Sequence, residues 1–269
     1  MSDEPLKTLE ISLDQGWLQL RLNRPEARNA LSDEMVSELL QLLETVAQRR
    51  DVRGITIRGN GGVFCAGGDL KGFKSGFQDN AADLARIEAA SERAGELFER
   101  INTMPQVVLM LVEGAAMAGG LGMVCAGDVV AVTKSAKFAL TEVTLGIPPA
   151  QIAPYVVGRL GLASARRLML TAARFDGGQA QELGLADYVV EDAAGLEQIE
   201  AEVQASVRRC APGAIAATKA LVLASGTQSG AEMRRTAAQS FARCMASDEA
   251  REGIAAFVEK RKPHWAENA

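Results

Sequence analysis

Histidine is nearly absent from this sequence of 269 residues. The one histidine, His264, lies five residues before the end of the chain. A Ser–His–Asp triad, or a metal site built from several histidines, needs histidine in the core of the fold, so the sequence argues against both. Proton transfer must then fall to carboxylates, lysine, tyrosine or the substrate itself.

Cysteine and long apolar runs are also scarce. The four cysteines are far apart and include no Cys-x-x-Cys pair, which is typical of buried thiols in a reducing compartment. Residues 1–7 are polar and no basic-then-apolar signal follows them. No apolar stretch is long enough to span a bilayer. We therefore expect a cytoplasmic protein with no membrane partner.

Positive charge is in deficit. The sequence has 29 lysines and arginines against 34 acidic residues, a net charge of -5, and its pI is about 5.2. An acidic surface offers no general attraction to nucleic acid or anionic membranes, although a local basic patch could still exist. We expect no nucleic-acid partner.

The first two thirds of the sequence alternate between strand and helix patterns. Hydrophobic residues make up 48% and charged residues 23%, which is typical of a globular protein with a sizeable core. Strands that alternate with helices favour βαβ units and right-handed crossovers. The expected strands are 17–22, 54–58, 107–112 and 128–133, and the expected helices are 32–48, 84–101 and a short one that reaches Ala126.

The last third of the sequence is expected to be helical, with no strand between its helices. Small helical appendages of this kind often pack against a neighbouring subunit. We therefore predict an α/β protein with a core domain at residues 1–195 and a helical oligomerisation region at 196–269. The expected helices of this region are 196–209, 212–224, 231–245 and 248–260.

Two segments of small residues, 64–70 and 114–122, each follow a short apolar run and lead toward a helix. Glycine lets a ligand approach the backbone closely, and the start of a helix presents free N–H groups. Two such loops that face one another would aim two donors at one oxygen, an oxyanion hole in which one donor is worth roughly 2.7–4 kcal/mol. Either loop alone is more often a tight turn or a close helix contact. Neither has the glycine spacing of a P-loop or a dinucleotide fingerprint.

A third segment, 138–149, contains Glu142, the lone charge between Lys137 and Arg159. Apolar surroundings would raise the pKa of this carboxyl by desolvation, which suits acid–base work. An exposed or helix-capping glutamate explains the pattern equally well. The residues alone leave both interpretations open.

These three segments together resemble the crotonase (enoyl-CoA hydratase/isomerase) family. The likeness extends from residues 18–25 and 29–31 to 257–261, nearly the whole chain. It implies a spiral of ββα units with a helical C-terminal trimerisation region, assembled as a trimer or a dimer of trimers. It also implies an acyl-CoA thioester substrate, with no metal and no separate cofactor, because coenzyme A enters as part of the substrate.

The resemblance also assigns roles to residues. Gly68 and Gly119 fall where the family supplies its two oxyanion-hole N–H groups, Glu142 falls on a catalytic glutamate, and the N–H of Ala150 helps to hold a water. Contacts to coenzyme A are implied for Arg24, Glu26, Ala27 and Arg28 at the nucleotide, for Ala66, Gly68, Asp69 and Leu70 at the adenine and pantetheine, and for Phe257 and Lys260 toward the coenzyme A of a neighbouring subunit.

One position departs from the family pattern. Typical hydratases of the family have two catalytic glutamates, and the first falls at Gly122, which cannot transfer a proton. This suggests either an isomerase, because such relatives often keep only the later glutamate, or a hydratase whose second proton comes by another route. The run 141–157 is similar to bacterial methylglutaconyl-CoA and isohexenylglutaconyl-CoA hydratases, which also tend to have glycine there. Their substrates have a branched enoyl chain with a second carboxylate.

The sequence therefore predicts a hydro-lyase that hydrates an α,β-unsaturated acyl-CoA of the branched glutaconyl type, in leucine or acyclic terpene catabolism. A Δ3,Δ2-enoyl-CoA isomerase is an alternative, because it needs only one carboxylate that removes and returns a proton. A non-catalytic acyl-CoA- or RNA-binding relative is another, against which the two glycines, Glu142 and the negative charge argue. For Gln151 and Tyr155, an acyl-chain contact and simple packing both stay open.

Overall fold

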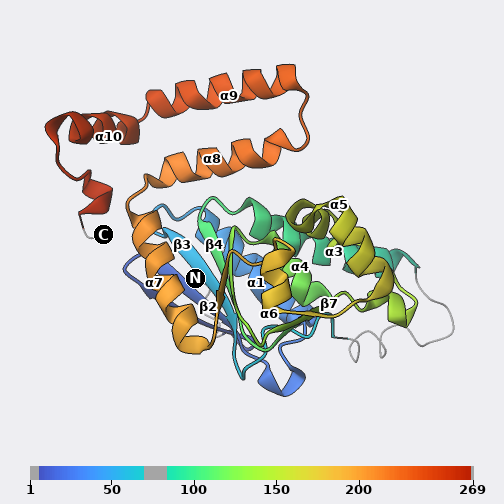
Figure 1. Ribbon diagram of the computed structural model, residues 1–269. Helices are drawn as coiled ribbons and strands as arrows, with labels where there is room; N and C mark the ends of the chain where they lie inside the picture. Colours follow the sequence, from blue (N-terminus) through green and yellow to red (C-terminus); the bar gives the residue numbers. More distant parts are fainter. Residues whose placement is uncertain (1–5, 70–83, 268–269) are drawn as a thin grey trace.

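The computed structural model describes residues 6–69 and 84–267. Its main sheet has six strands in the order β1-β2-β3-β4-β6-β9 (Figure 1). The first two strands form an antiparallel hairpin, and every later pairing is parallel, as expected for strands joined by helices. The strands are β1 (Leu9–Asp14), β2 (Trp17–Leu22), β3 (Gly54–Gly59), β4 (Val107–Val112), β6 (Val129–Thr133) and β9 (Tyr188–Val190).

Both faces of this sheet are covered, and strand alternation divides the core into two clusters. In β4, Val108 and Met110 face the larger cluster, whereas Leu109 and Leu111 face the smaller one. The larger cluster lies mainly under four long or central helices, with Ala180 of a short helix (177–182) at its edge, and the smaller one lies under α7, with Ile215 packed beside it. The helices over the larger cluster are α1 (Asp33–Ala47), α3 (Leu84–Thr103), α4 (Gly119–Ala126) and α5 (Ala153–Thr171).

A second, three-stranded sheet positions the loops of interest. It pairs β5 (Ala115–Met117) in parallel with β7 (Lys137–Ala139), and β7 antiparallel with β8 (Phe175–Asp176). Strand β5 leads into α4, and β7 leads into the short 3-10 helix η2 (Glu142–Leu145). The sheet therefore brings the second glycine loop and the Glu142 segment together. Two further short elements are η1 (Pro25–Ala27) and α6 (Gly177–Glu182).

The predicted C-terminal helices are all present, and they divide into two groups. Helix α7 (Ala193–Arg208) packs on the main sheet through Leu196, Val203 and Val207. Helices α8 (Pro212–Ser225), α9 (Gly230–Met245) and α10 (Asp248–Glu259) extend away from the sheet (Figure 1). The chain ends after η3 (His264–Ala266). None of the helices within residues 6–69 and 84–267 is long and apolar enough to cross a membrane.

The predicted division into a core at 1–195 and an oligomerisation region at 196–269 stays a prediction. Helix α7 spans that boundary and belongs with the sheet, so the helices that leave the core are α8 to α10. In these three helices only Ser240 and Ala256 are buried. Several large apolar side chains on them are exposed: Val222, Phe241, Met245, Ile254, Phe257 and Val258.

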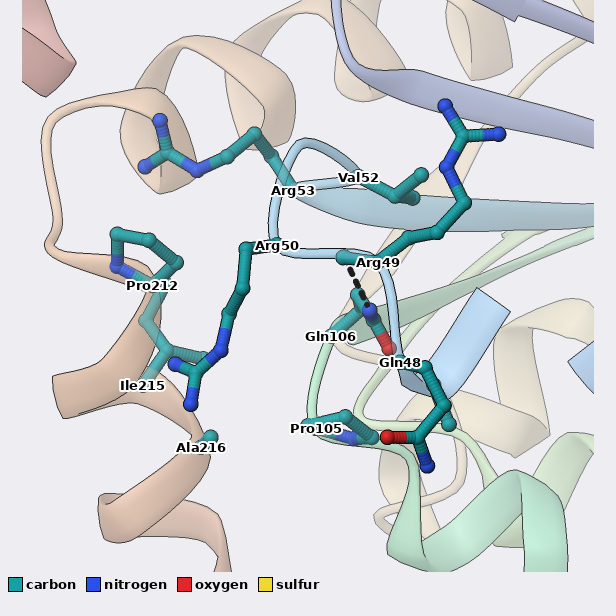
Figure 2. Close-up of a pocket in the computed structure, with 11 residues that line it drawn as sticks. Gln48, Arg49, Arg50, Val52, Arg53, Pro105, Gln106, Pro212, Ile215 and Ala216 are labelled. Atoms are coloured by element: carbon teal, nitrogen blue, oxygen red, sulfur yellow. Dashed lines mark hydrogen bonds between the residues drawn. The ribbon is translucent and has the colours of Figure 1, made fainter. Parts of the chain in front are cut away.

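A cavity of about 140 Å³ lies where α8 meets the loop between α1 and β3 (Figure 2). Three arginines of that loop line it, but their guanidinium groups point in different directions. Arg53 donates to the carbonyls of Val207 and Trp265, both at 3.2 Å, and Gln106 Nε2 donates to the Arg49 carbonyl at 3.1 Å. Arg53 therefore links the core to the end of α7 and to Trp265 near the end of the chain, whereas the Gln106–Arg49 bond joins two core loops.

A largely buried ion pair completes this joint. Lys219 Nζ of α8 lies 2.5 Å from Asp128 Oδ2 and 2.6 Å from the Gln106 carbonyl oxygen. The same Asp128 oxygen accepts a hydrogen bond of 2.7 Å from the N–H of Val108, at the start of β4. Burial raises the pKa of Asp128 and lowers the pKa of Lys219, because each charge is largely withdrawn from water in this pair.

Candidate active site

The first glycine loop is fixed by pairing with the segment that precedes α1. Leu31 N–H donates to the Gly67 carbonyl at 2.8 Å, and Asp69 N–H donates to the Leu31 carbonyl at 3.0 Å. This is a parallel bridge between Leu31 and Gly68. In such a bridge the middle residue turns its own N–H to the opposite side. The N–H of Gly68 therefore points away from Leu31.

The second glycine loop lies against the first glycine loop, next to Cys65. Cys65 N–H donates to the Ala115 carbonyl at 3.0 Å, and Met117 N–H donates to the Cys65 carbonyl at 2.9 Å. A Cβ atom added to Gly67 would lie 3.5 Å from the Gly119 nitrogen, and one added to Gly119 would lie 3.9 Å from the Gly68 nitrogen. The two predicted donors are therefore neighbours in space.

The backbone at the start of α4 is held in an unusual conformation. Ala118 has φ 49° and ψ -122°, a region that favours glycine, and its N–H donates to the Ala139 carbonyl at 2.8 Å. Gly119 is the first residue of the helix, so its N–H has no partner within the helix. In the described part of the chain, neither the Gly68 nor the Gly119 N–H enters a backbone hydrogen bond. Both donors are free to bind a ligand oxygen.

Glu142 is the first residue of η2, on the segment that the small sheet brings next to the second glycine loop. It follows Ala139 by three residues, and Ala139 pairs with Met117 and accepts from Ala118. Its Oε2 atom is buried without a hydrogen-bond partner among the described residues. Burial is the main cause that raises the pKa of this carboxyl. Glu142 is half-buried and is not the cap of a helix. The structure therefore favours an acid–base carboxyl over an exposed or helix-capping glutamate.

Gly122 lies one turn along α4 from Gly119, and Ile152 fills the space beside it. A Cβ atom on Gly122 would lie 2.1 Å from Ile152 Cγ2 and 3.5 Å from Phe98 Cε1. The preceding residue, Gln151, donates from Nε2 to Ser91 Oγ at 3.0 Å. In this structure Gln151 therefore packs against α3, and no local pattern in the sequence indicates that Ile152 reaches Gly122.

The predicted coenzyme A contacts near the first loop are partly brought together. Arg24 Nη2 lies 3.0 Å from Asp69 Oδ2, and Ala66 N–H donates to the Arg28 carbonyl at 3.0 Å. Residues 24, 28, 66 and 69 thus lie at one edge of the glycine loop. Glu26 and Arg28 are exposed there, and Ala27 is half-buried. Leu70 lies outside the described residues.

Sequence reasoning missed the side chain that organises this edge. Asn29 is fully buried, and its Nδ2 donates to the carbonyls of Asn60 at 2.8 Å and Val63 at 2.7 Å. Its Oδ1 accepts from the Arg24 N–H at 2.8 Å. Asn29 has a left-handed φ of 54°, which asparagine tolerates better than most residues. The asparagine of the 29–31 motif was the only sequence feature that pointed to this role.

Three predicted contacts are not part of this cluster. The N–H of Ala150 donates to the Pro148 carbonyl at 2.9 Å in this structure, and its role in holding a water stays a prediction. Phe257 and Lys260 lie on or just after α10, exposed and away from the glycine loops of their own chain (Figure 1). Their contact with the coenzyme A of a neighbouring subunit stays a prediction.

The arrangement can support one kind of chemistry well. Two backbone donors aimed at one position stabilise an oxygen on which negative charge develops, and a buried carboxylate nearby can accept and return a proton. Within residues 6–69 and 84–267 no group of three or more side chains is placed to hold a metal ion. The geometry therefore suits proton transfer next to a carbonyl group.

Comparisons with known proteins agree with this geometry. Residues 13–268 match the family model described as enoyl-CoA hydratase/isomerase. The human enoyl-CoA hydratase domain-containing protein 2, mitochondrial, is 32% identical over 258 residues, which cover 94% of this chain and 86% of that protein. The family match extends over most of the chain and includes both glycine loops and Glu142.

Solved structures show the same fold over nearly the whole length. Pseudomonas aeruginosa AtuE is 46% identical with a TM-score of 0.93, and covers 97% of this chain and 100% of its own. An enoyl-CoA hydratase/isomerase from Marinobacter aquaeolei is 38% identical with a TM-score of 0.92, and covers 97% and 99%. The mixed α/β fold is therefore the crotonase fold that the sequence predicted. The chain belongs to the enoyl-CoA hydratase/isomerase family.

Proposed function

We propose that this protein hydrates an α,β-unsaturated acyl-CoA whose acyl chain is branched and of the glutaconyl type, such as methylglutaconyl-CoA or isohexenylglutaconyl-CoA. The observation behind the proposal is the half-buried Glu142, whose Oε2 atom is buried without a hydrogen-bond partner among the described residues, on a segment paired with the loop that carries one of the two free N–H groups, those of Gly68 and Gly119. The similarity of the run 141–157 to hydratases of such substrates supports the branched acyl chain.

In the proposed reaction the thioester oxygen binds between the two N–H groups. Glu142 accepts a proton from water, and the water oxygen bonds to Cβ of the substrate. The electron pair of the double bond moves toward the thioester, where Gly68 and Gly119 stabilise the enolate oxygen. The proton that Glu142 gained is then delivered to Cα. Because Glu142 returns the proton it took, the addition of water balances with a single carboxylate.

The same single carboxylate supports a second candidate, a Δ3,Δ2-enoyl-CoA isomerase. Glu142 would remove a proton from C2 of a 3-enoyl-CoA and return it to C4, with the same enolate held by the two N–H groups. This route needs no water and no second acid, so the glycine at position 122 favours it as much as it favours a one-carboxylate hydratase.

A panel of purified thioesters separates these candidates. It contains a branched glutaconyl-CoA, a 2-enoyl-CoA of similar length without the distal carboxylate, crotonyl-CoA and a 3-enoyl-CoA. We expect kcat/KM to be highest for the branched glutaconyl-CoA, with a 3-hydroxyacyl-CoA as product. Equal turnover of crotonyl-CoA would contradict the substrate class, and preferred turnover of the 3-enoyl-CoA to a 2-enoyl-CoA would contradict hydration.

The proposed location, pathway and assembly of the protein follow from the same resemblance to these hydratases. We propose that it acts in the cytoplasm, in leucine or acyclic terpene catabolism, as a homotrimer or a dimer of trimers that uses no cofactor apart from the coenzyme A of its substrate. The exposed apolar side chains of α8 to α10 support assembly through these helices, because such surfaces are usually covered in the functional oligomer. Light scattering of the purified protein measures the assembly.

A further inference from the structure

Ile152 is fixed in the space where a side chain at position 122 would have to lie. A Cβ atom on Gly122 would be 2.1 Å from Ile152 Cγ2 and 2.7 Å from Ile152 Cβ. A rotamer change moves Cγ2 but leaves Cβ in place, so rotation of the Ile152 side chain does not open this space. Ile152 is 3% exposed, which leaves it no route into solvent.

The backbone on either side of Ile152 holds it there. Its carbonyl accepts from the N–H of Val156 at 3.0 Å, in the first turn of α5. Its neighbour Gln151 lies against Gly95 of α3, where an added Cβ atom would be 2.4 Å from Gln151 Oε1. The corner 151–152 therefore fits against two glycines on two different helices. Gly122 cannot gain a side chain without moving this corner, because Ile152 Cβ is in the way, whereas a side chain at Gly95 would displace only the flexible end of Gln151.

This space adjoins the donor site. Gly119 and Gly122 lie three residues apart on α4, so they lie on the same face of the helix. Phe98 contacts both positions, at 3.8 Å from an added Cβ on Gly119 and 3.5 Å from one on Gly122. A side chain at position 122 would thus extend along the wall beside the Gly119 donor. In this protein Ile152 and Phe98 form that wall, and it is apolar.

We propose that Ile152 is a specificity-determining residue that excludes a second acidic group from the site and so confines proton transfer to Glu142. The inference rests on the proposed function and extends it: the one-carboxylate site is built into the packing of α3, α4 and α5. A second acid would then require two changes together, one at Gly122 and one at Ile152.

A double-mutant cycle tests the steric part. Gly122→Ala is expected to lower Tm by on the order of 5 °C, because the new methyl group overlaps Ile152. Gly158→Ala is the matched control, since Gly158 lies in α5 with nothing within 4 Å of an added Cβ, and alanine favours helix. We expect Gly158→Ala to leave Tm unchanged or slightly higher. In the Ile152→Ala background, Gly122→Ala is expected to lower Tm by less than half as much. An equal loss in both backgrounds would overturn the proposal.

Activity tests the chemical part. We expect Gly122→Glu/Ile152→Ala to hydrate crotonyl-CoA at least 10-fold faster than Ile152→Ala alone, because it regains a second acid. A folded double variant without this gain would overturn the proposal, as would Gly122→Glu alone that is both stable and faster. If the double variant does not fold, the alanine cycle decides. Failure of the proposed function is seen separately, as a wild-type protein that hydrates none of the 2-enoyl-CoA thioesters.

Discussion

The core and the C-terminal helices α8 to α10 use apolar side chains in opposite ways. In the core, helix α1 buries Met35, Leu39 and Leu43 against the sheet, and all six residues of β3 are buried. Helix α8 is rich in alanine, valine and leucine, yet it buries no residue. The core covers most of its apolar side chains within one chain, although Leu162 and Leu170 of α5 are exposed, whereas the three C-terminal helices leave most of their large apolar side chains uncovered.

This difference indicates that the core, and not α8 to α10 of the same chain, holds the residues of the candidate site in position. Gly68, Gly119 and Glu142 all lie on segments next to the small sheet: a bridge joins Cys65 to Ala116, and β5 and β7, which pair, lead to Gly119 and Glu142. None of them depends on α8 to α10 of the same chain. We therefore expect changes in the site to alter the rate with little loss of stability, and changes at the joint to alter stability and assembly first.

The largest expected effect is the loss of activity in Glu142→Gln. The amide cannot accept the proton from water, so kcat should fall by roughly 10²–10⁴-fold while binding of the acyl-CoA persists. Because burial raises the folded-state pKa of Glu142, its ionised form destabilises the fold at pH values above that pKa. The variant should therefore have a slightly higher Tm at pH 7. Near-normal activity would contradict the role of Glu142.

A smaller loss is expected when one backbone donor is removed. Gly119→Pro eliminates the N–H at the first position of α4, where a helix tolerates proline. We expect kcat to fall by about 10²–10³-fold. Gly119→Ala keeps the N–H, and its closest contact is the end of the Leu31 side chain at 3.3 Å, so it should retain most of the activity. Stopped-flow measurement of kcat in both variants separates the loss of the N–H donor from the effect of added side-chain volume. Equal losses of kcat in the two variants would argue against the oxyanion hole.

The joint between the two regions is tested by Lys219→Met. This change leaves Asp128 partly buried without its cation, which we expect to cost about 3 kcal/mol of unfolding free energy. Addition of Asp128→Asn should recover part of this loss, because no unpaired charge then remains. Urea denaturation measures both variants. If Lys219→Met left the unfolding free energy unchanged, the ion pair would not be what holds α8 to the core.

The smallest expected effect comes from the strained residue at the start of α4. Ala118→Gly relieves a conformation with φ 49° that costs roughly 1–3 kcal/mol, against about 0.5–1 kcal/mol of added backbone entropy in the unfolded chain. We expect a net gain of about 1 kcal/mol in unfolding free energy with the rate nearly unchanged. Calorimetry gives the stability, and a loss of stability would show that the Ala118 methyl group contributes more through packing than it costs in strain.

The sequence predicted most of the fold, because long amphipathic helices and apolar strands repeat with a clear period. It missed the small sheet, whose strands β5 and β7 have three residues each, because so short an element shows no alternation. It also missed α5, in which Gly161 has a non-helical φ of 73° and interrupts the helix. Helix boundaries in the C-terminal third differ from prediction by at most three residues.

The candidate site was only partly predictable for a different reason. Gly68, Gly119 and Glu142 lie in motifs that can be read along the chain. The contact of Ile152 with Gly122 joins the residue just before α5 to a residue of α4, 30 positions away, so no local pattern indicates it. The same holds for the Ala150 N–H, whose bond to Pro148 depends on the path of the turn rather than on residue type. Three-dimensional packing decides which predicted groups remain free.

The pH dependence of kcat is the most direct test of Glu142 as the single proton-transfer group. Glu142 must be ionised to accept a proton, and burial raises its pKa, so kcat should fall on the acid side with one apparent pKa above the usual glutamate range. In Glu142→Gln this acid limb should disappear from the residual rate. An acid limb at the ordinary glutamate pKa, or one that persists in Glu142→Gln, would contradict the account.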